Sequence, residues 1–291
     1  YCQGGASQQF AMVPMNLRKT GKADYAATGS CAKKAAQEGA IYGDVKKVVD
    51  YSDRNFSYIP KVEPSRRDQG ASYLHITTNN TIYGTSYRNN LPETGSIPLV
   101  ADMSSDILSQ VIDVTRFGLI YAGAQKNIGP AGLTLVIMRK DLIGAPAFDK
   151  TPTMLQYQAV AETDSMYNTP PTFAIYMAGL VFAHLESLGG ISAVQEKNEY
   201  KAKLLYDALD NSQLFIPTAD VQDRSNMNVT FVSKDKDMDA AFVKEAAAAG
   251  LVNLKGHRSV GGMRASIYNA MPVEGVEALV RFIQEFETSR R

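Results

Sequence analysis

The segment FGLIYAGAQKNIGPAGLTLVIMRK, residues 117–140, joins two apolar runs through a turn that contains glycine and proline. Lys126 lies between the first run and that turn. Both runs are almost entirely apolar, a pattern typical of strands that helices cover on both faces. Because an ammonium group is costly to bury, a lysine at the end of a core strand is either a solvated surface residue or an amine with a chemical task.

Short apolar runs alternate with helical stretches through the rest of the first half. We expect a helix from Cys31, with Ser30 as its N-cap and Gly39 past its end. We expect strands at 23–28, 45–52, 71–78, 98–104, 117–124 and 133–140. The alternation predicts an α/β domain with a mainly parallel sheet flanked by helices, and such sheets bind ligands beyond the carboxyl ends of their strands.

The pattern changes after residue 170. Prolines begin a long helical stretch that Gly189 and Gly190 close, and a second helix is expected at 191–211. Beyond these we expect strands and helices in alternation, at 228–233, 237–250, 261–269 and 272–287. This order predicts a smaller α+β domain, so we divide the chain into domains at 1–186 and 187–291.

The composition narrows the function classes. The 291 residues are 45% hydrophobic, and 30 basic residues balance 30 acidic ones. A balanced charge argues against a nucleic-acid partner or an anionic membrane surface. No apolar stretch approaches the roughly 20 residues that a membrane span needs. Two cysteines, Cys2 and Cys31, do not form a disulfide framework, which predicts a cytoplasmic protein.

Three features together indicate a site for pyridoxal 5′-phosphate (PLP). Lys126 offers an amine for a Schiff base, and Asp102 ends the preceding apolar strand, where its carboxylate could pair with the pyridinium nitrogen. The segment QGGAS (3–7) reads as a glycine turn before a helix, which suits a phosphate. Each feature alone is more often an ordinary surface lysine, a turn aspartate or a plain turn. Only the set, in this order, favours a PLP site.

Five motifs carry a resemblance that covers the chain from end to end. They are QGGASQQFAMVPMNL (3–17), DMSSDILS (102–109), GAQKNIGPAG (123–132), NTPPTFAIY (168–176) and KGHRSVGGMRASIYNAMP (255–272). Together they resemble the phosphoserine aminotransferase family, which belongs to the class V aminotransferases and to the fold-type I PLP-dependent transferases. The resemblance implies a PLP-dependent, reversible transamination. In it, L-glutamate and 3-phosphohydroxypyruvate give 2-oxoglutarate and O-phospho-L-serine, and bacterial relatives also serve pyridoxine biosynthesis.

The family's site residues can be carried over to this sequence. The resemblance implies that Lys126 is the Schiff-base lysine and that Asp102 pairs with the ring nitrogen. Four further residues would hold the cofactor, with Thr81 on the phenolic oxygen, and Ala6, Ser7 and Gln125 on the phosphate. No metal is expected at this site.

The resemblance also implies a homodimer whose sites are shared. Asn168 and Thr169 would reach the cofactor phosphate of the neighbouring subunit. His257 and Arg258 would bind the phosphate of the substrate or the distal carboxylate of glutamate, although alone they read as surface polar residues. Arg264 would grip the α-carboxylate in bidentate fashion.

Two departures from the family pattern stand out. Cys31 occupies the position at which the family has a tryptophan stacked on the cofactor ring, and the chain has no tryptophan. The chain also opens on YCQGGAS, which reads as the last step of a strand, so we expect a preceding segment. The resemblance implies that this segment carries a further substrate-binding arginine. Two alternatives therefore remain: a PLP-binding subunit with little activity, and another class V enzyme, either a serine–glyoxylate type aminotransferase or a lyase. We assign His75 and His184 to packing.

Overall fold

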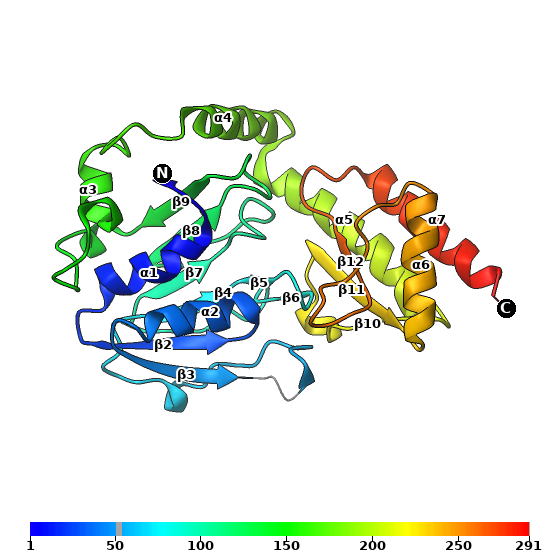
Figure 1. Cartoon of the computed structure of the whole chain (residues 1–291), viewed down its shortest axis with the longest axis horizontal. Helices are drawn as coiled ribbons and strands as arrows, with labels where there is room; N and C mark the ends of the chain where they lie inside the picture. The colour runs from blue at the N-terminus through cyan, green and yellow to red at the C-terminus, as the bar shows by residue number, and fades with distance from the viewer. Residues whose placement is uncertain (51–53, 291) are drawn as a thin grey trace.

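The computed structural model describes residues 1–50 and 54–290. Figure 1 shows two lobes, with the N-terminus in the left one and the C-terminus at the far end of the right one. The expected strand 45–52 is observed as β3 (Asp44–Asp50), and the last two residues of that expectation lie outside the described ranges.

Within the described ranges, seven strands form the sheet of the large lobe in the order β1-β9-β8-β7-β4-β2-β3. Besides β3, its members are β1 (Cys2–Gln3), β2 (Lys22–Ala27), β4 (Leu74–Thr77), β7 (Leu99–Asp102), β8 (Leu119–Gly123) and β9 (Leu133–Met138). The strands from β3 to β8 pair in parallel, whereas β9 runs antiparallel to both β8 and β1. The predicted α/β domain with a mainly parallel sheet is confirmed.

Helices cover both faces of this sheet, as the apolar strands require. On one face, α1 (Ala6–Leu17) and α2 (Ser30–Gly39) pack over a cluster that includes Tyr25 and Tyr121. On the other face, Ala174 and Ala178 of α4 (Thr172–Ser187) join a second apolar cluster. The short helix α3 (Tyr157–Glu162) lies beside α1 (Figure 1).

The small lobe has its own sheet and core. An antiparallel sheet is formed by β10 (Phe215–Pro217), β11 (Asn228–Ser233) and β12 (Met263–Ser266). Three helices pack on it, namely α5 (Gly190–Asp210), α6 (Lys236–Ala248) and α7 (Val273–Thr288). The predicted α+β arrangement is confirmed.

The chain bends by 81° between α4 and α5, which passes it from one lobe to the other. This bend supports our proposal that the domains divide at residues 186 and 187. Across the described residues, no single helix is both long and apolar enough to cross a membrane; α4 and α5 meet that test only when taken together across the bend.

Some local expectations were wrong or incomplete. The N-cap of α2 is Gly29, and Ser30 is already the first helical residue, because Gly29 takes an extended backbone that ends the preceding turn. Gly39 is the last residue of α2 rather than the residue after it. The sequence analysis also missed α3, β10 and the short hairpin of β5 (Asn79–Asn80) and β6 (Thr85–Ser86).

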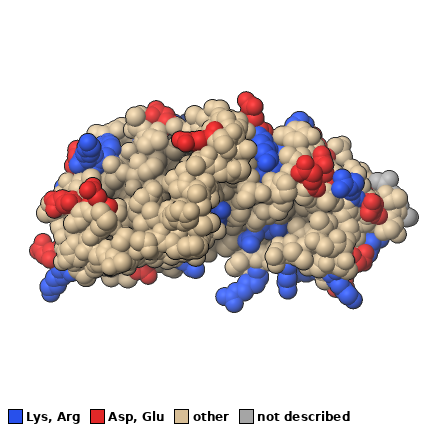
Figure 2. Space-filling view, turned by 90° about the horizontal axis from the view of Figure 1, so that it is seen from above, with Lys and Arg blue, Asp and Glu red and all other residues tan. Residues whose placement is uncertain are grey.

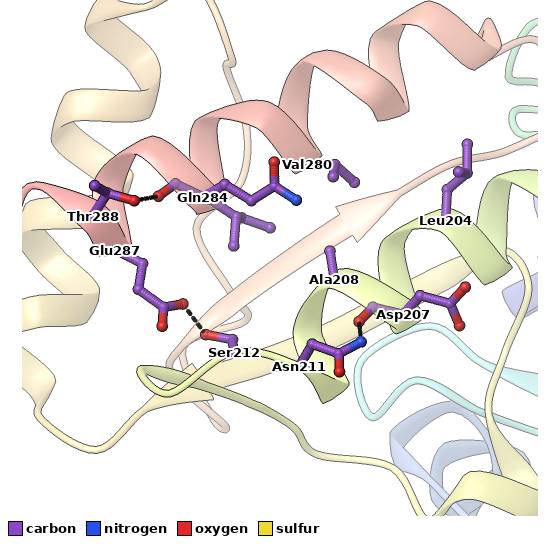
Figure 3. A pocket seen from close by; sticks show the side chains of 10 residues that line it. Leu204, Asp207, Ala208, Asn211, Ser212, Val280, Gln284, Glu287 and Thr288 are labelled. Atoms are coloured by element: carbon purple, nitrogen blue, oxygen red, sulfur yellow. Dashed lines mark hydrogen bonds between the residues drawn. The ribbon is translucent and has the colours of Figure 1, made fainter.

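A cavity of about 360 Å³ lies between the carboxyl-terminal parts of α5 and α7. Figure 3 shows Ser212 below it, with the hydroxyl donating to the carboxylate of Glu287 at 2.7 Å. The backbone N–H of Gln213 also donates to Glu287. These bonds attach the last helix to the loop before β10, and the lining contains none of the residues predicted for the PLP site.

Candidate active site

The strand ends bring the predicted residues to one edge of the large sheet. Thr77, Asp102 and Tyr121 are paired across β4, β7 and β8, so these parallel strands end close together. The segments that follow β4 and β8 carry Thr81 and Lys126. Ligands of such sheets bind at this carboxyl edge, and the site is built there.

Lys126 is held by a tight turn after β8. The carbonyl of Ala124 accepts hydrogen bonds from the N–H groups of Ile128 and Gly129, at 3.2 and 2.7 Å. The half-buried Lys126 then directs its Nζ to the hydroxyl of Thr81, at 3.2 Å. The two residues are separated by 45 positions in the chain. The lysine is therefore placed by the fold and is not a freely solvated surface residue.

Asp102 is the buried anion of the site, with 4% of its surface exposed. Its Oδ1 accepts hydrogen bonds from the N–H of Ser104 at 2.9 Å and from the Ser104 hydroxyl at 2.6 Å. Burial raises the pKa of the carboxyl, while the bonds from Ser104 and the charge of Lys126 lower it. A buried carboxylate of this kind gains from a cation at a fixed position.

The start of α1 lies at the same edge. Cys2 pairs with Thr134 of β9, and Thr134 pairs with Gly123 at the end of β8. Gly4 follows with a φ of +87°, a conformation that glycine adopts without strain. Gly5 is the N-cap in an extended conformation.

Among the described residues, no side chain caps the N-terminus of α1. The first turn of this helix, which begins with Ala6 and Ser7, contains no acidic residue. The free N–H groups and the helix dipole therefore suit an anion. Ala6 is half-buried and Ser7 is exposed. The side chain of Gln125 lies over Gly123 at the end of β8. Its Oε1 is so close that a Cβ at position 123 would lie 2.6 Å from it.

These groups fit PLP. An amine, a buried carboxylate and an uncapped helix N-terminus lie along one sheet edge, and they match the aldehyde, the pyridinium nitrogen and the phosphate of the cofactor. No cluster of three His, Cys, Asp or Glu that could hold a metal ion is found within residues 1–50 and 54–290.

Cys31 lies in the first turn of α2, beside this edge. Partial burial raises the pKa of its thiol, and the nearby charges of Asp102 and Lys126 act on it in opposite directions. The residue as a whole remains exposed, so the thiol is not packed in the core. This position supports the expectation that Cys31 faces the cofactor ring.

Arg264 approaches from the small domain. It lies on the same face of β12 as Ser266. The hydroxyl of Ser266 accepts from Asn228, and Asn228 in turn accepts from Asn79 of the large domain. This face of the small sheet is therefore turned toward the carboxyl edge. Arg264 is half-buried and forms no ion pair with any described residue, which leaves its guanidinium available for a ligand anion.

His257 and Arg258 lie in the turn before β12. Nδ1 of His257 lies 2.7 Å from the hydroxyl of Ser259, whose N–H also points at that nitrogen. Ser259 in turn bonds to the hydroxyl of Tyr83, which belongs to the large domain. Arg258 is exposed. The turn lies on the small-domain side of the site, but no contact places either side chain beside Lys126.

Asn168 and Thr169 are not brought to Lys126. Both are exposed in the segment between α3 and α4, and the side chain of Gln3 donates to the carbonyl of Thr169 at 2.8 Å. Their exposure leaves them available to a second subunit, the role that the sequence analysis gave them.

Several polar contacts around the site were missed by the sequence analysis. Asn127, next to Lys126, accepts from the N–H of Asn269, and the ring of Tyr268 has its centroid 6.0 Å from Nζ of Lys126. Lys201, fully buried, donates to the carbonyls of residues 267, 268 and 271 and so holds that segment. The sequence does carry a sign of the role of Lys201. This lysine occupies a position of α5 at which the helical periodicity predicts a buried apolar residue.

Comparison with known proteins agrees with this geometry. Residues 1–279 match the family model for class V aminotransferases. The chain is 56% identical to a phosphoserine aminotransferase of Listeria monocytogenes, over all of this chain and 79% of the relative. A phosphoserine aminotransferase structure from Bacillus circulans subsp. alkalophilus aligns with a TM-score of 0.95 and 46% identity, over 100% of this chain and 80% of that one. A PLP-bound phosphoserine aminotransferase structure from Trichomonas vaginalis aligns with a TM-score of 0.91 and 38% identity, over 97% and 81% of the two chains.

Proposed function

Since this chain belongs to the class V aminotransferase family, and within it to the phosphoserine aminotransferases, it is a PLP-dependent transaminase of the fold-type I class, and we propose how its side chains divide the work. The reaction interconverts phosphoserine and 3-phosphohydroxypyruvate, with glutamate and 2-oxoglutarate as the second pair. The high identity over the whole chain favours this activity over that of a serine–glyoxylate type enzyme. The observation that carries the assignment of roles is the placement of Lys126, Thr81 and Asp102 at one sheet edge.

When bound, PLP supplies an aldehyde that takes up the amino group and a ring that withdraws electrons from the substrate α-carbon. Lys126 would hold the cofactor through that aldehyde and would move the proton at the substrate α-carbon. The carboxylate of Asp102 would hold the ring nitrogen. Thr81 holds the phenolic oxygen and keeps the lysine amine in position, since the two already lie in contact.

Ala6 and Ser7, in the first turn of α1, and Gln125 would hold the phosphate of the cofactor as hydrogen-bond donors. The substrate is held from the opposite side. Arg264 binds its α-carboxylate through a two-pronged hydrogen bond, and His257 and Arg258 bind its phosphate or the distal carboxylate of glutamate. This division supports one site for both substrates, because each presents an anion at both ends.

Two measurements test the central role of Lys126. Borohydride reduction followed by peptide mapping should place the cofactor mass on the peptide that contains Lys126. Lys126→Ala should lose both turnover of phosphoserine with 2-oxoglutarate and the visible absorbance of the bound cofactor, while the surface variant Lys203→Ala keeps both. Cofactor mass on any other lysine would overturn the assignment. A protein that is labelled at Lys126 but does not turn over would instead be the PLP-binding subunit with little activity.

We further propose that the enzyme is a homodimer formed through the outer face of α4. Phe173, Tyr176 and Leu180 are 71%, 64% and 48% exposed, while Ala174 and Ala178 on the other side of the same helix are buried in the large domain. Figure 2, seen from the side on which α4 lies, shows that the middle of the large lobe is mostly uncharged, with charged residues along its edges. An apolar, uncharged helix face of this kind marks a protein interface.

Oligomeric state and subunit mixing test this proposal. We expect a particle of twice the 31.7 kDa chain mass by light scattering, and a monomer after Phe173→Asp combined with Tyr176→Asp. If Asn168 and Thr169 complete the partner's site, the double alanine variant at these positions is inactive. Mixing it with Lys126→Ala then restores roughly a quarter of the activity, because half of the dimers are mixed and each holds one complete site. No recovery from stable mixed dimers would contradict shared sites.

The place of action is also a proposal. Composition supports the cytoplasm, since the two cysteines, Cys2 and Cys31, are both unpaired in the structure. Fractionation of cells followed by the transaminase assay would test it, and activity outside the cytoplasmic fraction would contradict it.

A further inference from the structure

A line of buried polar rings crosses the large sheet behind Asp102. Asp102 pairs with Tyr121 across β7 and β8, and Tyr25 pairs with His75 across β2 and β4. In parallel strands, paired residues direct their side chains to the same face. This is the face that α1 and α2 cover, so none of these groups meets solvent.

His75 and Tyr121 are in direct contact. Nε2 of His75 lies 2.9 Å from the hydroxyl of Tyr121. The imidazole also stacks on the ring of Tyr25, with the centroids 5.0 Å apart. The sequence analysis assigned His75 to packing, and this bond adds a polar function to that role. Burial lowers the pKa of His75 to about 3, so the imidazole is neutral at physiological pH.

The buried carboxylate of Asp102 fixes the direction of the hydrogen bonds. Nδ1 of His75 is buried and has no partner among the described residues. Either tautomer of the neutral ring leaves Nδ1 without a partner, so Tyr121 decides the order: its one hydroxyl hydrogen bonds more strongly to the buried carboxylate of Asp102 than to a neutral ring nitrogen. The favoured order therefore places the N–H on Nε2, donating to the Tyr121 oxygen. The hydroxyl hydrogen of Tyr121 is then free to point at Asp102.

A bond from Tyr121 to Asp102 acts against the effect of burial. Burial, the largest influence, raises the pKa of the Asp102 carboxyl, and the hydrogen bond from the Tyr121 side chain is one of the groups that lower it. The remaining charged and titratable groups that face Asp102 are Lys126, Cys31 and Asp106. The Ser104 bonds hold Asp102 from its own loop, while Tyr121 holds it from the neighbouring strand.

We propose that Tyr121 and His75 are positioning residues for Asp102, and that His75 orients the Tyr121 hydroxyl so that it stabilises the ionised carboxylate. This inference rests on the proposed role of Asp102 toward the ring nitrogen of PLP. These two hydrogen bonds, from His75 to Tyr121 and from Tyr121 to Asp102, keep the Asp102 carboxylate charged and in position before PLP binds. Both residues would act through Asp102 and not on the cofactor itself.

Titration of the apoprotein with PLP tests the proposal, with a matched control. Tyr121→Phe removes one buried hydroxyl and keeps the ring. We expect its Kd for PLP to rise about 10- to 100-fold, the effect of one hydrogen bond to a charged group. Tyr25→Phe removes an equally buried hydroxyl on the same face, but that hydroxyl bonds Tyr73 at 2.7 Å and should leave the Kd within about threefold. Equal effects of the two variants, or no effect of Tyr121→Phe, would overturn the proposal.

A second measurement does not depend on the stability of a variant. The chain has three histidines, so the ¹⁵N signals of a histidine-labelled protein can be assigned by substitution of each. His75 should remain neutral to below pH 5, with its proton on Nε2. A proton on Nδ1 would refute the proposed chain. Asp102→Asn tests the proposed role of Asp102 separately from that of Tyr121 and His75. If this variant leaves the Kd for PLP unchanged, the role of Asp102 itself is refuted. If it raises the Kd while Tyr121→Phe does not, only the role of Tyr121 and His75 is refuted.

Discussion

Cys31→Trp should strengthen the binding of PLP, because an indole at this position could stack on the cofactor ring. Cys31 is exposed in the first turn of α2, and the charges of Asp102 and Lys126 both reach its thiol. Room for a larger side chain is therefore available on the cofactor side. An aromatic contact contributes about 0.5–1.5 kcal/mol beyond the area that it buries, which lowers the Kd for PLP by about 2- to 13-fold.

The assay uses the absence of tryptophan from the chain. The introduced indole is the protein's single tryptophan, so its emission should be quenched as PLP is added to the apoprotein. Ile41→Trp provides the control, because Ile41 is 68% exposed just beyond the other end of α2. It should show little quenching and a Kd, measured by cofactor absorbance, equal to that of the unchanged protein.

A tryptophan at position 31 that is quenched no more than the one at position 41 would show that residue 31 does not face the ring. Quenching without a lower Kd would place the residue correctly but refute the stacking energy. Cys31→Ala supplies the reference for loss of the thiol alone. We expect it to match the unchanged protein within about twofold, since a thiol forms only weak hydrogen bonds.

Three further predictions concern the charged groups. Lys201→Met should lower the free energy of unfolding by about 3 kcal/mol in urea titrations, because three buried carbonyls lose their donor. The exposed variant Lys203→Met should cost less than about 0.5 kcal/mol. Equal losses would contradict the anchoring role of Lys201. The Asp102→Asn apoprotein should gain stability relative to the unchanged apoprotein as pH rises above about 4. Burial raises the folded pKa of Asp102 above its unfolded value, so ionisation of the buried carboxyl costs the unchanged protein stability. Parallel curves of unfolding free energy against pH would contradict this. Arg264→Lys should raise the KM for glutamate and phosphoserine and leave the Kd for PLP unchanged, and a weaker Kd for PLP would refute its assignment to the substrate.

The sequence was sufficient for the central strands and for the residues at their ends. Strands β7 and β8 are short and almost wholly apolar, so the change to polar residues at Asp102 and after Gly123 marked their carboxyl ends. Hydrophobic runs determine such boundaries because both faces of the sheet are buried. The two residues at the centre of the proposed site, Asp102 and Lys126, are predicted from this signal alone.

Pairing between distant segments could not be predicted in the same way. The bond between Asn79 and Asn228 joins residues 149 positions apart, and that between His75 and Tyr121 joins residues on strands separated by β7. Each depends on strand order and register, which hydrophobic pattern alone does not specify. His75 was therefore assigned to packing, although burial without a polar partner would be unfavourable for its ring nitrogens.

The division of charges between the two domains has a consequence for how the enzyme binds its ligands. The groups assigned to PLP lie on the large domain, around Lys126 and Asp102, whereas Arg264 and the 257–258 turn belong to the small one. Neutral hydrogen bonds join the domains at the sheet edge, as between Asn79 and Asn228 or between Thr230 and the carbonyl of Tyr83, and two ion pairs, Arg54–Asp220 and Arg88–Glu199, join them as well. Neutral hydrogen bonds are weaker than ion pairs with a bound anion, so a substrate that bridges Arg264 and the cofactor contributes directly to the association of the domains. Cofactor affinity should therefore depend mainly on the large domain, and substrate affinity on how the small domain is held against it.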